Sequence, residues 1–142
     1  MHGIALVAYS STAGSILPEL QWHEEFIITK RTITLVRKGR MPETQVNVGR
    51  WEWPADEDAV TALFALLEPL ECADLRRVEP DDAPDGGHTE RYSITYGQKQ
   101  CCDLHYEPGV SYIGGEWVVG PVQAFLRQLG IPPTIAQRYR MR

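Results

Sequence analysis

The feature that most constrains the fold of this chain is a pair of short segments within residues 89–106, one on each side of a turn that contains a glycine. Apolar and polar residues alternate through both runs, which is the pattern of a β-hairpin with one face toward a core and the other toward water. The apolar residues are Tyr92, Ile94 and Tyr96 before the turn, and Cys102, Leu104 and Tyr106 after it. The chain therefore contains a two-stranded unit that must bury one face against another part of the protein.

The parity of the two runs predicts the register of this hairpin. A three-residue loop, 97–99, pairs Ile94 with Cys102 and keeps the apolar residues on one face. A two-residue loop would set apolar residues opposite polar ones, and a slip by one residue moves a whole set to the other face. We therefore predict the three-residue loop, with Tyr96 opposite Gln100.

Two further segments have the spacing of amphipathic helices. In the first, Asp56 has the position of an N-cap, and an apolar stripe at i, i+3, i+4 and i+7 follows over residues 60–67. In the second, a similar stripe covers residues 122–129, with Pro121 expected at the first helical position and Gly130 just past the end.

The remaining apolar segments are typical of short strands joined by turns. They are 25–37 (two strands, or one bulged strand), 44–53, 72–78, and a tight hairpin of 110–113 with 116–119. Because strands outnumber helices and follow one another closely, the sequence predicts an α+β fold, an antiparallel sheet with two amphipathic helices packed on one face. Residues 1–21 are predicted to be a flexible N-terminal lead-in, 22–130 a single α+β domain, and 131–142 an extended basic C-terminal arm.

Composition narrows the classes of function. A chain of 142 residues, 43% apolar, is long enough for one core, and its net charge of −5 argues against nucleic acid as a partner. No apolar run approaches the roughly 20 residues of a membrane-spanning helix. The apolar run at 4–9 lacks the preceding positive charge of a secretory signal. The default prediction is a cytoplasmic protein, and a secreted or cell-envelope protein stays open if a native leader is missing.

The three cysteines, Cys72, Cys101 and Cys102, are an odd and low number, which is not typical of a disulfide framework. We expect reduced thiols used as small apolar side chains. In an oxidising compartment, Cys72 could bridge to either member of the adjacent pair, and the sequence does not choose between them.

Three segments carry a resemblance to known proteins: FIITKRTITLVRKG (26–39), VEPDDAPDGG (78–87) and YSITYG (92–97). Their order resembles that of small bacterial domains of unassigned function. A Pro-Asp-Gly turn followed by a Tyr-x-Ile-x-Tyr strand is also similar to emfourin-type inhibitors of bacterial metallopeptidases. The resemblance implies an α+β module and assigns no inhibitory residue to a position of this chain.

An acidic loop before the hairpin is the candidate metal site. Calcium takes six to eight oxygen ligands, and four carboxylates lie close together in this loop. They are Asp81, Asp82, Asp85 and Glu90. Their spacing does not match an EF-hand loop, and the alternative is a solvated turn rich in turn-forming residues. No other cofactor is predicted.

Two polar residues of the hairpin, Asp103 and His105, stand at i, i+2 on its polar face. They could hold a transition metal if His88 or His23 joined them. The favoured alternative is a cross-strand polar ladder in which Arg91 faces His105.

No complete catalytic set, phosphate-binding loop or nucleophile motif occurs in the chain. Aromatic residues such as Trp51, Trp53 and Trp117 are expected in the core rather than on a stacking platform for a sugar or peptide.

The first hypothesis is therefore a non-enzymatic module that binds a protein or peptide. Its candidate surfaces are the polar face of the hairpin, the acidic loop, the basic tail, and an open sheet edge that adds a strand. Self-association stays open. The alternatives are a cation-binding envelope domain, and an enzyme whose site assembles from Asp103, His105 and His88.

Overall fold

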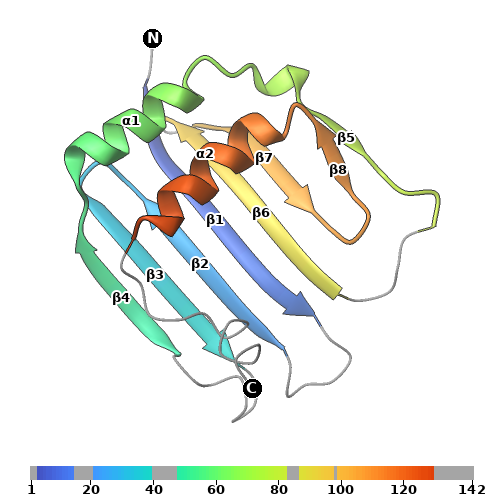
Figure 1. The fold of residues 1–142 in the computed structure, drawn as a ribbon, viewed down its shortest axis with the longest axis horizontal. Helices are drawn as coiled ribbons and strands as arrows, with labels where there is room; N and C mark the ends of the chain where they lie inside the picture. The colour runs from blue at the N-terminus through green and yellow to red at the C-terminus, as the bar shows by residue number, and fades with distance from the viewer. Residues whose placement is uncertain (1–2, 15–20, 40–47, 83–86, 98, 130–142) are drawn as a thin grey trace.

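The computed structural model describes residues 3–14, 21–39, 48–82, 87–97 and 99–129, which contain eight strands and two α-helices (Figure 1). The strands are β1 (Ile4–Gly14), β2 (Trp22–Ile28), β3 (Thr32–Gly39), β4 (Gly49–Pro54), β5 (Arg76–Val78), β6 (Gly87–Tyr96), β7 (Lys99–Tyr106) and β8 (Ser111–Ile113). The helices are α1 (Glu57–Leu67) and α2 (Glu116–Arg127), with a single 3₁₀ turn at Cys72–Asp74.

Six strands form one antiparallel sheet in the order β4-β3-β2-β1-β6-β7, and β5 pairs with β8 in a separate two-stranded sheet. Both helices lie on the same face of the large sheet (Figure 1). The predicted α+β class, with an antiparallel sheet and two helices on one face, is confirmed. No helix of the described ranges is long and apolar enough to cross a bilayer.

The predicted N-terminal lead-in, 1–21, is wrong for residues 4–14, which form the central strand β1. This strand pairs with β2 on one side and with β6 on the other. Its second half, Ser10 to Gly14, is small and polar and has no apolar alternation, so it reads as a loop in the sequence. The predicted arm at 131–142 lies outside the described residues.

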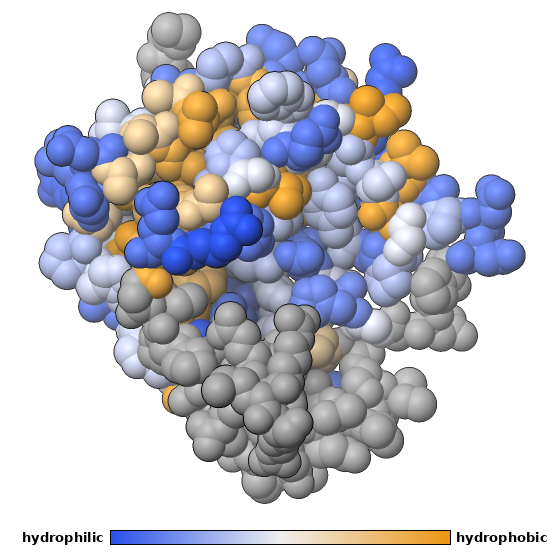
Figure 2. Space-filling view, viewed as in Figure 1, coloured by the Kyte–Doolittle hydropathy of each residue, from blue (hydrophilic) through white to orange (hydrophobic). Residues whose placement is uncertain are grey.

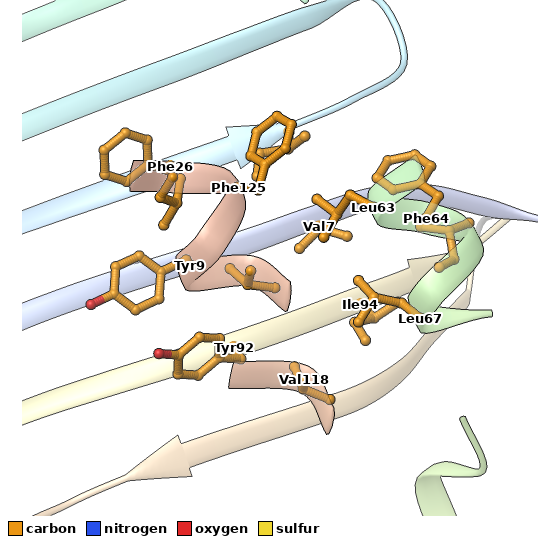
Figure 3. Packing of buried hydrophobic residues seen from close by; sticks show 14 of the residues in the cluster. Val7, Tyr9, Phe26, Leu63, Phe64, Leu67, Tyr92, Ile94, Val118 and Phe125 are labelled. Carbon is orange, nitrogen blue, oxygen red and sulfur yellow. The ribbon is translucent and has the colours of Figure 1, made fainter. Parts of the chain in front are cut away.

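Apolar side chains of the sheet lie in two transverse rows beneath the helices (Figure 3). The first row, from β4 to β7, is Trp53, Ile33, Ile28, Val7, Ile94 and Cys102. The second is Trp51, Leu35, Phe26, Tyr9, Tyr92 and Leu104. The helices bury Val60, Leu63, Phe64 and Leu67 from α1, and Val118, Val122, Phe125 and Leu126 from α2. Burial of these opposed apolar surfaces is the main stabilising term.

The N-terminus of α1 matches its sequence signal. The Asp56 carboxylate accepts hydrogen bonds from the backbone N–H groups of Asp58 (3.1 Å) and Ala59 (3.3 Å). The start of α2 does not. Pro121 lies inside this helix rather than at its first position, and 116–119 is the first turn of α2 rather than a strand. The apolar spacing that includes Val118 overrides the expected proline boundary.

The hairpin of β6 and β7 pairs Ile94 with Cys102 as predicted, but its loop differs. Tyr96 pairs with Lys99 rather than Gln100, and the register shifts between Ile94 and Thr95. The loop is therefore two residues long, and a bulge at Cys101 restores the parity of the apolar residues. Gly97, at φ 61°, supplies the turn conformation that other residues rarely adopt.

A disulfide between Cys72 and Cys102 joins the 3₁₀ turn to β7, with their Cα atoms 5.4 Å apart. Reduced thiols were the expectation, and the fold instead brings these two cysteines to bonding distance. The bond spans 30 residues of chain and ties the connection after α1 to the sheet.

We expect reduction of this bond to lower the free energy of unfolding by about 3 to 4 kcal/mol, because a cross-link across 30 residues restricts the unfolded chain. Denaturant unfolding with and without reductant measures the change. The Cys101→Ser variant should keep the full reductant sensitivity of the wild type, and Cys72→Ser should have none. Equal sensitivity in all three proteins would contradict the pairing.

Candidate functional site

On the helix-bearing face of the sheet, the transverse row that follows the two apolar rows consists mostly of polar residues. The third transverse row, from β4 to β7, is Gly49, Arg37, Glu24, Ser11, Glu90 and Tyr106. We call it the polar row. Arg37 is only 1% exposed, and Glu24 and Ser11 are 5% exposed. Such groups are tolerated in the interior only when they are paired.

The polar row is held by an ion pair between Arg37 and Glu24. Arg37 Nε donates to Glu24 Oε2 at 2.5 Å, and the Arg37 guanidinium lies 5.5 Å from the centre of the Trp51 ring. Gly49 is opposite Arg37 and leaves room for that ring, because a Cβ at Gly49 would stand 3.3 Å from it. This end of the row is therefore neutralised and packed.

The other end of the polar row joins two buried tyrosines. Tyr9 donates to Glu90 Oε2 at 2.5 Å, Tyr92 approaches the same oxygen at 3.4 Å, and Gln123 of α2 donates to the Tyr92 hydroxyl at 2.8 Å. Burial, followed by the hydrogen bond to Glu90, raises the pKa of Tyr9 well above its ordinary range. Burial likewise raises the pKa of Tyr92. Both phenols stay protonated and act as donors.

A serine–histidine contact lies beside this cluster, with Ser11 Oγ 3.0 Å from His88 Nε2. A nucleophilic enzyme needs such a contact, a third group that orients the base, and room for substrate. The Ser11 hydroxyl belongs to a buried residue, and in the described structure the His88 ring contacts Trp22 rather than a carboxylate. The contact is therefore structural.

The hypothetical enzyme set of Asp103, His105 and His88 is not assembled. Asp103 and His105 lie on the open face of the sheet, whereas His88 lies on the helix-bearing face beside Ser11. His23 is also on the open face, but it is on β2, three strands away from β7. Three strand spacings amount to about 14 Å. The same separation rules out the transition-metal site considered for these residues.

The predicted calcium ligands are only partly described. Asp81 and Asp82 are exposed, and Asp85 lies outside the described residues. Glu90 is engaged with Tyr9 on the helix-bearing face, so a cation would have to displace that hydrogen bond. Among the residues that the structure describes, no three His, Cys, Asp or Glu side chains gather as a metal site. The calcium site stays a prediction.

The open face of the hairpin carries the predicted polar ladder. Arg91 lies opposite His105, and its guanidinium binds the Asp103 carboxylate through two nitrogens, with Nε 2.8 Å from Oδ1. The hydrogen bonds to Asp103 raise the pKa of Arg91. A shallow groove of about 300 Å³ lies between Arg91 and Glu25, over the small side chains of Ala8, Ser10 and Ser93. This face is polar, and its charges already have partners within the sheet.

At one edge of the large sheet, side chains from the small sheet cover the backbone of His105 on β7. Arg77 of β5 donates to the carbonyl oxygen of His105 at 2.9 Å, and the His105 N–H donates to the Tyr112 hydroxyl at 2.9 Å. Tyr112 of β8 also packs against Tyr106, with ring centres 5.0 Å apart. Backbone groups that β7 turns outward at His105 are thus satisfied, and a strand cannot add there without displacing Arg77 and Tyr112.

The other side of this small sheet exposes large apolar side chains. Tyr112 and Arg77 face β7, so their neighbours Ile113 and Val78 face outward. Ile113 is 60% exposed and Val78 is 44% exposed. Trp117, four residues after Ile113 in the first turn of α2, is 65% exposed. We call Val78, Ile113 and Trp117 the apolar patch.

Figure 2 shows hydrophobic residues over β5 and β8 and a second group over α1, on the helix-bearing side of the molecule. Core burial of aromatic residues is a wrong prediction for Trp117, because 65% of its surface is exposed, although Trp51 and Trp53 do pack against the core. The apolar spacing of α2 could have predicted the exposure of Trp117. Trp117 precedes the inward-facing Val118 by one position, which turns it to solvent once the helix begins at Glu116.

A scan against family models, and searches of curated proteins and of solved structures, found no match to this chain. The resemblance to emfourin-type inhibitors stays a prediction.

We expect Glu24→Gln to lower the free energy of unfolding by about 3 kcal/mol, because it removes the charge that neutralises the buried Arg37 guanidinium. The matched control is Glu79→Gln, which removes an exposed carboxylate that pairs with Arg77 and should change stability by less than about 1 kcal/mol. Urea unfolding of both variants measures the difference. Equal losses would contradict the role given to the buried pair.

Proposed function

We propose that this protein is a non-enzymatic module that binds a protein partner through the apolar patch. The exposure of Trp117 carries the proposal, since a tryptophan with 65% of its surface in water is a large unburied apolar area. Contiguous exposed apolar groups mark protein interaction sites in soluble proteins. Tryptophan is also the residue type most enriched among those that dominate binding energy.

The surroundings of the patch support a protein partner rather than a small molecule. Val78 and Ile113 stand on the small two-stranded sheet, and Arg76 is the cross-strand neighbour of Ile113 on the same face. An apolar centre beside an arginine is typical of the compositions found in protein interfaces. The three side chains of the patch are exposed, whereas a small ligand usually needs a concave pocket that encloses it.

The polar face of the hairpin is a weaker candidate surface than the sequence indicates. Its most prominent charge, Arg91, is committed to Asp103 through two hydrogen bonds. A partner that used this charge would have to compete with an existing ion pair. The patch offers apolar area with no comparable loss.

The disulfide supports a location in an oxidising compartment, outside the cytoplasm. Disulfides persist in secreted and envelope proteins and are rare where thiols are kept reduced. Cys102 is buried, so the bond between Cys72 and Cys102 acts as a structural link of the fold. Differential alkylation of the protein from its native cells, followed by mass measurement, tests this location. Free thiols at both positions would contradict it.

We expect Trp117→Ala to weaken capture of the partner about thirtyfold, the effect of losing a central contact of about 2 kcal/mol. The assay is affinity capture from the native organism with immobilised wild type, Trp117→Ala and Leu66→Ala. Leu66 is a matched control because it is 61% exposed on α1 and outside the patch. Circular dichroism should show the same fold for all three.

Two outcomes would contradict the proposal. One is a captured protein that binds Trp117→Ala as well as the wild type. The other is a captured protein that both variants lose equally, since that result indicates general adhesion to apolar surface.

A further inference from the structure

The two edges of the large sheet differ in how they end. At β7 the outward backbone groups of His105 are bound by Arg77 and Tyr112. At the opposite edge β4 is the outermost strand, and within the described residues no strand pairs with its outer side (Figure 1). An edge strand of this kind is a template for a further strand.

The hydrogen bonding of β4 shows which of its residues turn outward. Ala55 N donates to Arg31 O at 2.9 Å, so this pair is bonded toward β3. Bonded and non-bonded pairs alternate along an antiparallel ladder. Trp53 and Trp51 are therefore also bonded toward β3, and the backbone groups of Arg50 and Glu52 point away from the sheet.

Pro54 fits the same pattern. It pairs with Thr32 at a position where the N–H would point outward, which is where an edge strand tolerates proline. The outer side of β4 therefore offers the N–H and C=O groups of Arg50 and Glu52.

We propose that β4 pairs with β4 of a second copy of this chain, antiparallel, about a two-fold axis that passes through Trp51. In this register Arg50 lies opposite Glu52 of the second copy, and Glu52 lies opposite its Arg50. Both residues turn their backbone groups outward, so each opposed pair exchanges two hydrogen bonds. The strand overlaps over its whole length, because Val48 then lies opposite Pro54.

Charge selects this register over its neighbours. Moving the axis to Arg50 would set the two arginines opposite each other, and moving it to Glu52 would do the same with the two glutamates. Like charges directly opposite in a ladder are destabilising, and opposite charges are favourable. Shifts by one residue would oppose an outward-turned group to an inward-turned one. One register therefore satisfies overlap, hydrogen bonding and charge together.

The side chains on the helix-bearing face agree with this pairing. Trp51 meets Trp51 of the second copy at a non-bonded position, where side chains approach most closely. Trp53 lies opposite Gly49 of the second copy, a large residue against one without a side chain. On the open face, Arg50 and Glu52 already form a pair at 3.1 Å within one copy. In the dimer, Arg50 and Glu52 of the second copy lie beside this pair, so four charges of alternating sign meet on the open face.

Sedimentation velocity of the purified full chain tests the proposal. The expected mass is twice the 16.1 kDa of one chain, with a reversible fall toward the monomer on dilution. Arg50→Glu should halve the observed mass, because four acidic side chains would then meet across the pair. Exchanging both charges, Arg50→Glu with Glu52→Arg, should restore the dimer, since the exchanged residues still lie opposite each other.

Hydrogen exchange adds a readout at the strand itself. The backbone amides of Arg50 and Glu52 should exchange slowly in the dimer and quickly in Arg50→Glu, while the amide of Trp51, which bonds toward β3, should change little. Trp117→Ala is the control for the other surface and should remain dimeric.

A wild-type protein that stays monomeric at every concentration would overturn the proposal. So would a dimer that persists in Arg50→Glu, or one that the double exchange fails to restore although it folds. None of these results bears on the apolar patch, which lies on the small sheet and α2, so the dimer and the protein-binding function can fail separately.

Discussion

The packing of α1 and α2 onto one face of the sheet is the interaction on which the rest of the structure depends. A pleated sheet sends alternate side chains to opposite faces, so one buried face fixes the register of every strand that crosses it. Tyr9 and Tyr92 belong to the buried set, and this places Ser10 and Arg91 on the open face. The polarity of the open face is a consequence of that assignment.

Much of the fold follows from periodicity, and the failures have physical causes. The β6–β7 hairpin and both helical stripes were predicted, because each buries one continuous apolar face. The sequence does not predict β1, because its second half, Ser10 to Gly14, has no alternating apolar residues. Ser11 in this half belongs to the polar row, where a central strand needs no apolar side chain. The predicted hairpin of 110–113 with 116–119 needs a turn at Gly114 and Gly115, yet Gly115 is the N-cap of α2 and its lack of a side chain leaves room for the Tyr106 hydroxyl. A pair of glycines suits a hairpin turn and the start of a helix equally well, and only the tertiary packing decides between the two.

The candidate site was less predictable than the fold. The ion pair of Arg37 with Glu24 depends on the register between β2 and β3, which the sequence alone does not give. Arg37 ends the predicted strand run 25–37, and Glu24 lies just before it. The choice of Cys102 over Cys101 as the partner of Cys72 follows from which of them points into the core, and the parity of the hairpin contained that information. The exposure of Trp117 needed the correct start of α2. Adjacent residues on a helix differ by about 100° in direction, so an error of a few residues at a boundary exchanges inside and outside.

The difference between the two sheet edges is the last step in locating where this protein meets others. At β7, side chains that are remote in sequence are committed to covering one residue's backbone, and Arg77 alone reaches His105, Tyr112 and two carboxylates. Proteins commonly protect an exposed edge with charges of one sign or with strand-breaking residues. At β4 the charges of Arg50 and Glu52 have opposite signs and stand symmetrically about Trp51, an arrangement that is complementary to a second copy in the proposed register. Opposite charges on an edge strand favour one register of pairing over the others. They can therefore limit which strand pairs there although no side chain covers the edge.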